Sequence, residues 1–154
     1  MTQVRFFDQA RNEDLKFAVI AARMDGKWLL CRHKERATWE FPGGHREEGE
    51  NIHDTARREL WEETGAHDFQ LEPVSAYAVD TDGETSYGAL FFAQVRELGE
   101  RPAQFEIGEN RLFDALPGEL TYPEIIPALM DYIQRWLEED NFRDEIDDIF
   151  ELMV

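Results

Sequence analysis

The sequence is poor in cysteine, in basic side chains and in long apolar runs. Its single cysteine, Cys31, has no second cysteine for an internal disulfide, and no spacing of Cys and His indicates structural zinc. No stretch approaches the roughly 18 consecutive apolar residues of a membrane-spanning helix, and the first residues lack the apolar run of a secretory signal. We therefore expect a protein of a reducing, cytoplasmic compartment that has no membrane partner.

Basic residues are outnumbered: 16 Lys and Arg stand against 34 Asp and Glu, which gives a formal net charge of −18. Binding along a nucleic-acid backbone depends on counterion release by Lys and Arg, so we expect no duplex nucleic acid partner. A small anionic ligand can still bind where a metal ion or a local basic group reverses the field.

The chain of 154 residues has the length of one domain, and its hydrophobic share of 42% is enough for a core. Apolar alternation and turn signals predict strands over residues 17–24, 28–33, 69–80, 85–95 and 104–113, the last broken at Gly108. Asp25 and Gly26 mark the turn of a hairpin, and Pro42-Gly43-Gly44 should break any regular element.

Two helices are expected, over residues 52–64 and 123–138. The acidic residues 138–154 read as a short docked helix or a frayed end. Strands on both sides of one central helix, with a second helix near the C-terminus, indicate an α/β (α+β) layered domain with a mixed sheet and a core over about residues 15–137. The short hairpin connections argue against an all-parallel sheet.

The central helix carries an unusual acidic face. Asn51 is a suitable N-cap and Gly65 a suitable C-terminal stop, and between them Glu59, Glu62 and Glu63 lie three and four positions apart. Like charges at this spacing repel, and the C-terminal end of a helix disfavours anions. The arrangement becomes favourable when Mg²⁺ binds among the carboxylates, so we expect a divalent metal site here.

The preceding loop suits the same purpose. Gly44 has no Cβ, so its backbone can pass close to the helix and its carbonyl can join the metal ligands. Arg58 points about 100° around the helix from Glu59. From there it could pair with Glu50 and tie the loop to the helix, which is a structural role and not a catalytic one.

The full pattern, Gly-x5-Glu-x7-Arg-Glu-Leu-x-Glu-Glu-x-Gly-Ala from Gly44 to Ala66, resembles the signature box of the Nudix hydrolases with no departure. At about 7% per residue type, its seven fixed positions would coincide by chance about once in 10⁸ starting points. The preceding Trp39-Glu40-Phe41-Pro42-Gly43 also resembles the family's usual lead-in.

The resemblance implies an α/β/α sandwich that hydrolyses a nucleoside diphosphate linked to another group, with Mg²⁺ or Mn²⁺ as the cofactor. It assigns Glu59, Glu62 and Glu63 as metal ligands together with the carbonyl of Gly44 or Gly43. Gly44, Glu50, Arg58 and Gly65 would be structural positions of the box. In the MutT-like branch the water-activating base would be Glu59; elsewhere in the family it comes from a later loop, where Glu109 is the first candidate and Glu106 the second.

Substrate identity lies outside the box. The proline of ADP-ribose hydrolases, about fifteen residues after the box, has no match at Thr81 and Asp82, and the tyrosine of dinucleoside polyphosphate hydrolases is missing near Gly83. These absences favour a MutT-like pyrophosphatase of nucleoside triphosphates, with oxidised purine nucleotides such as 8-oxo-dGTP as candidates. Nucleotide sugars, dinucleoside polyphosphates and capped RNA ends remain alternatives.

Four residues outside the box are candidates for substrate binding. Arg32 and Lys34 belong to a basic cluster and could meet phosphates, although charges at an exposed strand end also oppose edge pairing. Trp39 and Tyr87, like Tyr77 and Phe91, could stack on a base, although strand aromatics are more often core residues. Two rival readings also stay open: a catalytically silent Nudix-fold binding module, and an interaction protein that uses its acidic C-terminal region. The sequence leaves open whether the chain forms a homodimer.

Overall fold

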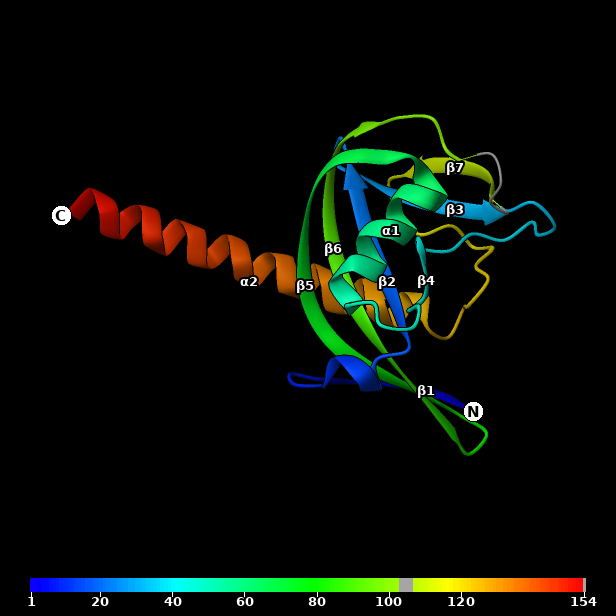
Figure 1. Ribbon diagram of the computed structural model, residues 1–154. Helices are drawn as coiled ribbons and strands as arrows, with labels where there is room; N and C mark the ends of the chain where they lie inside the picture. The colour runs from blue at the N-terminus through cyan, green and yellow to red at the C-terminus, as the bar shows by residue number, and fades with distance from the viewer. Residues whose placement is uncertain (103–106, 154) are drawn as a thin grey trace.

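The computed structural model describes residues 1–102 and 107–153, with side chains described as far as residue 139. Its centre is a sheet in the order β1-β5-β6-β2-β3-β7, with β4 paired to β2 beside this row (Figure 1). Strand β2 runs parallel to β6, and every other described pair is antiparallel. The sheet is mixed, as predicted. Its strands are β1 (Thr2–Phe7), β2 (Phe17–Met24), β3 (Lys27–His33), β4 (Gly43–His45), β5 (Ala66–Thr81), β6 (Glu84–Leu98) and β7 (Ile107–Phe113).

The two helices cover opposite faces of the sheet: α1 (Ile52–Thr64) lies on one and α2 (Ile126–Met153) on the other (Figure 1). Alternate strand residues supply the two cores. Ile20 and Leu29 pack in the cluster beneath α1 together with Leu60. Leu30 packs in the cluster beneath α2 together with Leu129. Because both faces of β2 and β3 are covered, residues 17–22 and 28–31 are apolar without interruption, and the α/β/α sandwich is confirmed.

The predicted hairpins are present. β2 turns into β3 through Asp25 and Gly26, with φ values of 53° and 76°, and β5 turns into β6 through Asp82 and Gly83, with φ values of 51° and 83°. Positive φ at both central residues is what a two-residue hairpin turn requires, and Asp-Gly accepts it at low cost. β5 and β6 extend beyond the predicted bounds at both ends.

Helix α1 has the predicted bounds. The side chain of Asn51 accepts a hydrogen bond from the backbone N–H of His53, and Gly65 ends the helix in the left-handed region with φ 78°. These two ends place the three glutamates of the box in the last two turns of the helix.

Three expectations about the strands were wrong or incomplete. Gly43 and Gly44 form strand β4 instead of breaking regular structure, because the missing side chain lets this backbone approach β2: a Cβ on Gly43 would lie 2.5 Å from the carbonyl oxygen of Ala18. Gly108 does not break β7; it is the extra residue of a bulge opposite the Arg32–His33 step. Strand β1 was not predicted, and residues 104–106 of the predicted last strand lie outside the described residues.

Helix α2 differs from the prediction at both ends. It begins at Ile126, with Pro127 in its first turn, and it continues to Met153 as one helix (Figure 1). Residues 138–153 therefore extend α2 and form neither a separate docked helix nor a frayed end. Within the described residues, no helix is both long and apolar enough to cross a bilayer.

Candidate active site

The acidic face of α1 lies directly against β4. The backbone N–H of Gly43 donates a hydrogen bond of 2.7 Å to Oε1 of Glu63. A Cβ on Gly44 would overlap the carboxyl group of Glu59. Because Gly44 has no Cβ, the carboxyl group of Glu59 can lie against the β4 backbone, which is the close approach expected from the sequence.

Arg58 organises the rest of the acidic face. Its guanidinium donates hydrogen bonds of 2.8 and 3.0 Å to the two carboxylate oxygens of Glu50 and one of 3.0 Å to the carbonyl oxygen of His45. These contacts tie the loop to the helix, as predicted. The same guanidinium also donates to Glu59 at 2.8 Å and to Glu62 at 3.2 Å, contacts that the sequence analysis did not anticipate.

The pKa values of these carboxyl groups are perturbed in opposite directions. Burial raises the pKa of Glu63 to about 8, and the negative charges of Glu59, Glu40 and Glu62 add to this rise while the Gly43 N–H opposes it. Burial also raises the pKa of Glu59, although Arg58 opposes it. Hydrogen bonding from Arg58 lowers the pKa of Glu50 to about 2.

The donors at this site fit a divalent cation in chemistry. Glu59, Glu62 and Glu63 are hard oxygen donors of the kind that Mg²⁺ prefers, and their negative charge exceeds what the guanidinium of Arg58 compensates. Among the described residues, no three acidic, His or Cys side chains converge on one point as a metal would require. Two of the carboxylates lie around Arg58 instead.

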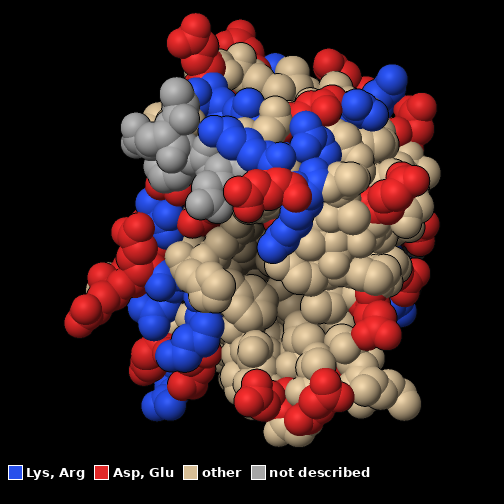
Figure 2. Space-filling model, turned by 90° about the vertical axis from the view of Figure 1, so that its right-hand side faces the viewer, with Lys and Arg blue, Asp and Glu red and all other residues tan. Residues whose placement is uncertain are grey.

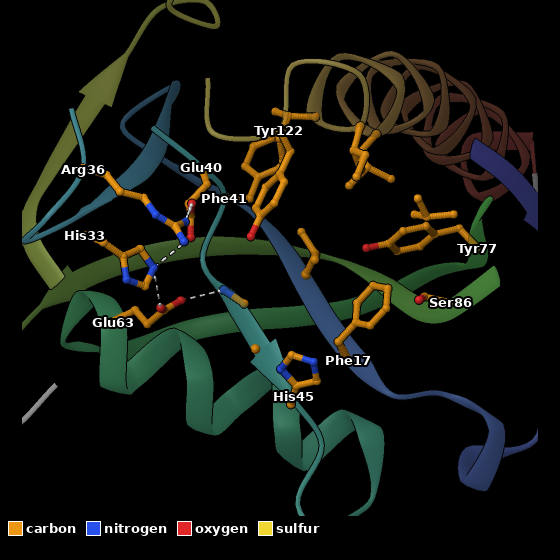
Figure 3. A pocket seen from close by; sticks show the side chains of 17 residues that line it. Phe17, His33, Arg36, Glu40, Phe41, His45, Glu63, Tyr77, Ser86 and Tyr122 are labelled. Carbon is orange, nitrogen blue, oxygen red and sulfur yellow. Dashed lines mark hydrogen bonds and ion pairs between the residues drawn. The ribbon is translucent and has the colours of Figure 1, made fainter. Parts of the chain in front are cut away.

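A cavity of about 480 Å³ opens beside Glu63 and runs along the face of the sheet that α2 covers (Figure 3). Its charged lining residues gather where Glu63 reaches it, and its apolar residues line the part toward α2 and β5. On the corresponding side of the molecule, Figure 2 shows a hollow among uncharged residues with Lys and Arg side chains at its border. The residues that line the cavity are Phe17, Val19, His33, Arg36, Glu40, Phe41, Gly43, Gly44, His45, Glu63, Tyr77, Val79, Ser86, Tyr122, Ile125, Ile126 and Leu129.

His33, Arg36 and Glu40 form a polar cluster at the charged end of this cavity. Nε2 of His33 lies 2.8 Å from Oε1 of Glu40 and 3.9 Å from Oε2 of Glu63. Nη1 of Arg36 lies 3.5 Å from the other oxygen of Glu40. The cluster thus places the imidazole of His33 between Glu40 and Glu63, with the guanidinium of Arg36 on the far side of Glu40.

Glu109, the first candidate for a base from a later loop, is paired with two arginines. The carboxylate of Glu109 binds Arg111 at 2.7 Å and lies 3.7 Å from Arg32, which is its cross-strand neighbour in β3. Since successive strand residues face opposite sides, Arg32 and Glu109 lie on the other side of the strand from His33. Glu106 lies outside the described residues.

None of the four predicted substrate-binding residues lines the cavity. Arg32 instead donates hydrogen bonds to the carbonyl oxygens of His33 and Arg36, at 3.2 and 2.9 Å, and so holds the turn that follows β3. Trp39 is buried in the core beneath α2, 5.0 Å from the ring of Phe113. Lys34 is exposed, and Tyr87 packs edge-on against Phe7.

Sequence reasoning missed the roles of His33, Arg36 and Glu40. The predicted strand ends at His33, as β3 does, but the basic cluster indicated Arg32 and Lys34, whereas the cavity is lined by His33 and by Arg36 after it. Glu40 carried a signal, because it stands in the lead-in segment only three residues before Gly43.

Comparisons with known proteins agree with this geometry. The model of the NUDIX domain matches residues 14–143. The chain is 34% identical over 119 residues to the Bacillus subtilis protein named "Putative 8-oxo-dGTP diphosphatase YtkD". The aligned stretch covers 77% of this chain and 75% of that protein. It is 43% identical over 56 residues to an RNA pyrophosphohydrolase of Caulobacter vibrioides, a stretch that covers 34% of this chain and 33% of that protein.

Among solved structures, the pyrophosphohydrolase BsRppH of Bacillus subtilis superposes with a TM-score of 0.73 at 28% identity, over 87% of this chain and 90% of that one. The family model spans most of the chain. The matched residues include helix α1 with its glutamates and strand β4 with its two glycines. The protein belongs to the Nudix hydrolase family and is a pyrophosphohydrolase.

Proposed function

We propose that this Nudix pyrophosphohydrolase cleaves nucleoside triphosphates, including oxidised purine nucleotides such as 8-oxo-dGTP. The observation that carries the proposal is the two-ended cavity, in which Glu63, His33 and Arg36 line one end and apolar side chains line the other. A nucleotide has the same division between a charged phosphate chain and a largely apolar base. The name of the relative from Bacillus subtilis supports the same substrate class.

The proposed cofactor is Mg²⁺, with Mn²⁺ as the alternative, held by Glu59, Glu62, Glu63 and the carbonyl of Gly44. When bound, such an ion neutralises phosphate oxygens and lowers the pKa of a bound water. In this arrangement β4 and the N–H of Gly43 orient the carboxylate of Glu63. Arg58 orients those of Glu59 and Glu62.

We assign the water-activating base to Glu59. Its carboxyl group lies against the backbone of Gly44, whose carbonyl is the other proposed ligand of the ion. It lies on the same helix face as Glu63, one turn away. Glu109, the other described candidate, is held by Arg111 and Arg32.

A second candidate substrate is the 5′-triphosphate end of RNA. The RNA pyrophosphohydrolase of Caulobacter vibrioides and the BsRppH structure favour it. Such a substrate would place only its first nucleotides in the cavity. The net charge of −18 disfavours extended contact with the rest of the strand.

The test is a hydrolysis screen with Mg²⁺ across dNTPs, NTPs, 8-oxo-dGTP, 5′-triphosphorylated RNA, a nucleotide sugar and a dinucleoside polyphosphate. We expect pyrophosphate release from nucleoside triphosphates at the highest kcat/KM. A preference for triphosphorylated RNA would select the second candidate, and a preference for the last two substrates would refute the proposal. No hydrolysis of any substrate would favour a catalytically silent binding module.

Single substitutions test which glutamates take part in catalysis. Glu63→Gln should lower kcat by at least about 10²-fold, because an amide cannot replace the charge of the carboxylate. Glu59→Gln should also lower kcat strongly, and Glu109→Gln should not. Glu72→Gln, on an exposed position of β5, is the matched control and should keep the wild-type rate. If Glu109→Gln abolished turnover and Glu59→Gln did not, the assignment of the base would be wrong.

The cytoplasmic location and the homodimer stay predictions. Sedimentation equilibrium of the full chain, with and without nucleotide, measures the oligomeric state directly.

A further inference from the structure

The apolar end of the cavity contains one buried polar group that no protein atom uses. Tyr77 on β5 lines the cavity beside Phe17 and Val79, and only 1% of the surface of this residue is exposed. Its hydroxyl oxygen points into the cavity (Figure 3). Among the described side chains and backbone groups, none forms a hydrogen bond with this hydroxyl.

An unpartnered hydroxyl at such a position is unusual. Buried tyrosine hydroxyls usually have a hydrogen-bond partner, because removing the hydroxyl from water without one costs free energy. Burial also raises the pKa of Tyr77, so the group stays protonated and can donate as well as accept.

The packing of the ring does not account for the hydroxyl. The Tyr77 ring lies 5.6 Å from the ring of Phe17 and 6.3 Å from that of Phe6. A phenylalanine would make the same ring contacts and would leave no polar atom unpaired. These contacts do fix the direction of the hydroxyl, so it is presented to the cavity in one orientation.

We infer that the Tyr77 hydroxyl hydrogen-bonds the nucleobase of the substrate and is a specificity-determining residue of this enzyme. The inference rests on the proposed function, because it places the base in the apolar end while the phosphates lie near Glu63. The other hydroxyls that line this cavity belong to Ser86, which is exposed, and to Tyr122, which is 46% exposed, so water can serve both.

The test compares Tyr77→Phe with wild type on two substrates, a nucleoside triphosphate and 2′-deoxyribose 5′-triphosphate, which lacks the base. We expect kcat/KM to fall about 3- to 10-fold for the nucleotide, as the loss of one neutral hydrogen bond gives, and less than about 2-fold for the abasic compound. Tyr132→Phe is the matched control, because Tyr132 stacks on Phe6 in the same cluster without lining the cavity. It should leave both values unchanged.

Two results would overturn the inference: an equal fall for both substrates, or no fall for the nucleotide. Urea unfolding of the free proteins shows whether a change in kcat/KM comes from a folding defect. The free energy of unfolding of Tyr77→Phe should be at least that of wild type, because the unpaired hydroxyl is gone. Calorimetric binding of a nucleoside monophosphate provides a readout that does not need hydrolysis. If wild type binds the monophosphate without hydrolysing any triphosphate, the proposed function fails, while weaker binding by Tyr77→Phe would still support the inference.

Discussion

Replacing Arg58 by methionine tests how the acidic face is held together without metal. The guanidinium donates five hydrogen bonds, two to Glu50, one each to Glu59 and Glu62, and one to the backbone of His45. Removing one member of a fully buried ion pair costs about 3–5 kcal/mol. Since the Arg58 side chain is 21% exposed, we expect the free energy of unfolding to fall by about 2–3 kcal/mol.

The assay is urea unfolding at neutral pH, first with a chelator and then with saturating Mg²⁺. With the chelator, Arg58→Met should show the full loss, because three carboxylates are left without their cation. Mg²⁺ adds stability to both proteins by binding to the folded state, and the loss should shrink because the carboxylates of Glu59 and Glu62, no longer paired with a guanidinium, bind the ion more tightly in Arg58→Met. Arg57→Met is the matched control, because Arg57 is exposed and its guanidinium lies over the ring of Phe69, away from these carboxylates.

Either of two outcomes would refute this reasoning. A loss below about 1 kcal/mol with the chelator would mean that Arg58 does not compensate these carboxylates. A loss that Mg²⁺ leaves unchanged would mean that removing Arg58 does not strengthen the binding of the ion by Glu59 and Glu62.

Two more predictions concern the contact between α1 and β4. Burial raises the pKa of Glu63 to about 8 in the folded protein, so between about pH 4.5 and pH 8 the unfolded chain loses this proton first and stability falls as pH rises. With a chelator, Glu63→Gln should therefore gain stability relative to wild type between pH 5 and pH 8, measured by urea unfolding; an equal difference at both pH values would contradict this. Gly44→Ala should displace the Glu59 carboxyl and lower kcat at least about tenfold. The control is Gly118→Ala, where a Cβ meets no atom within 4 Å, and it should keep the wild-type rate. A fully active Gly44→Ala would disprove the argument that the Glu59 carboxyl must lie against Gly44.

Local chemistry made α1 the most predictable element. Its N-cap, its glycine stop and the spacing of its glutamates are all encoded within fifteen consecutive residues, and the structure has the predicted bounds. The two Asp-Gly hairpins were predictable for the same reason, since a two-residue turn depends on the residues in it.

Elements that depend on distant partners were predicted less well. Gly43 and Gly44 looked like a break because glycine disfavours strands, yet the nearby backbone of β2 makes them a strand. β1 has weak signals of its own and exists through its pairing with residues 76–81 of β5. The cross-strand register also pairs Glu109 with Arg32 on the side of the strand away from His33, a contact that their positions in the sequence do not indicate.

The sequence by itself determined the family and the acidic helix, because the box lies within 23 contiguous residues whose spacing acts through one helix and one loop. Only the tertiary structure decided which residues meet that helix from elsewhere. His33 reaches Glu63 from the end of β3, Glu40 binds His33 from the lead-in segment, and Tyr77 comes from β5. The physical reason is that the cavity forms where β2, β5 and α2 pack together, and long-range packing leaves no periodic signal along the chain.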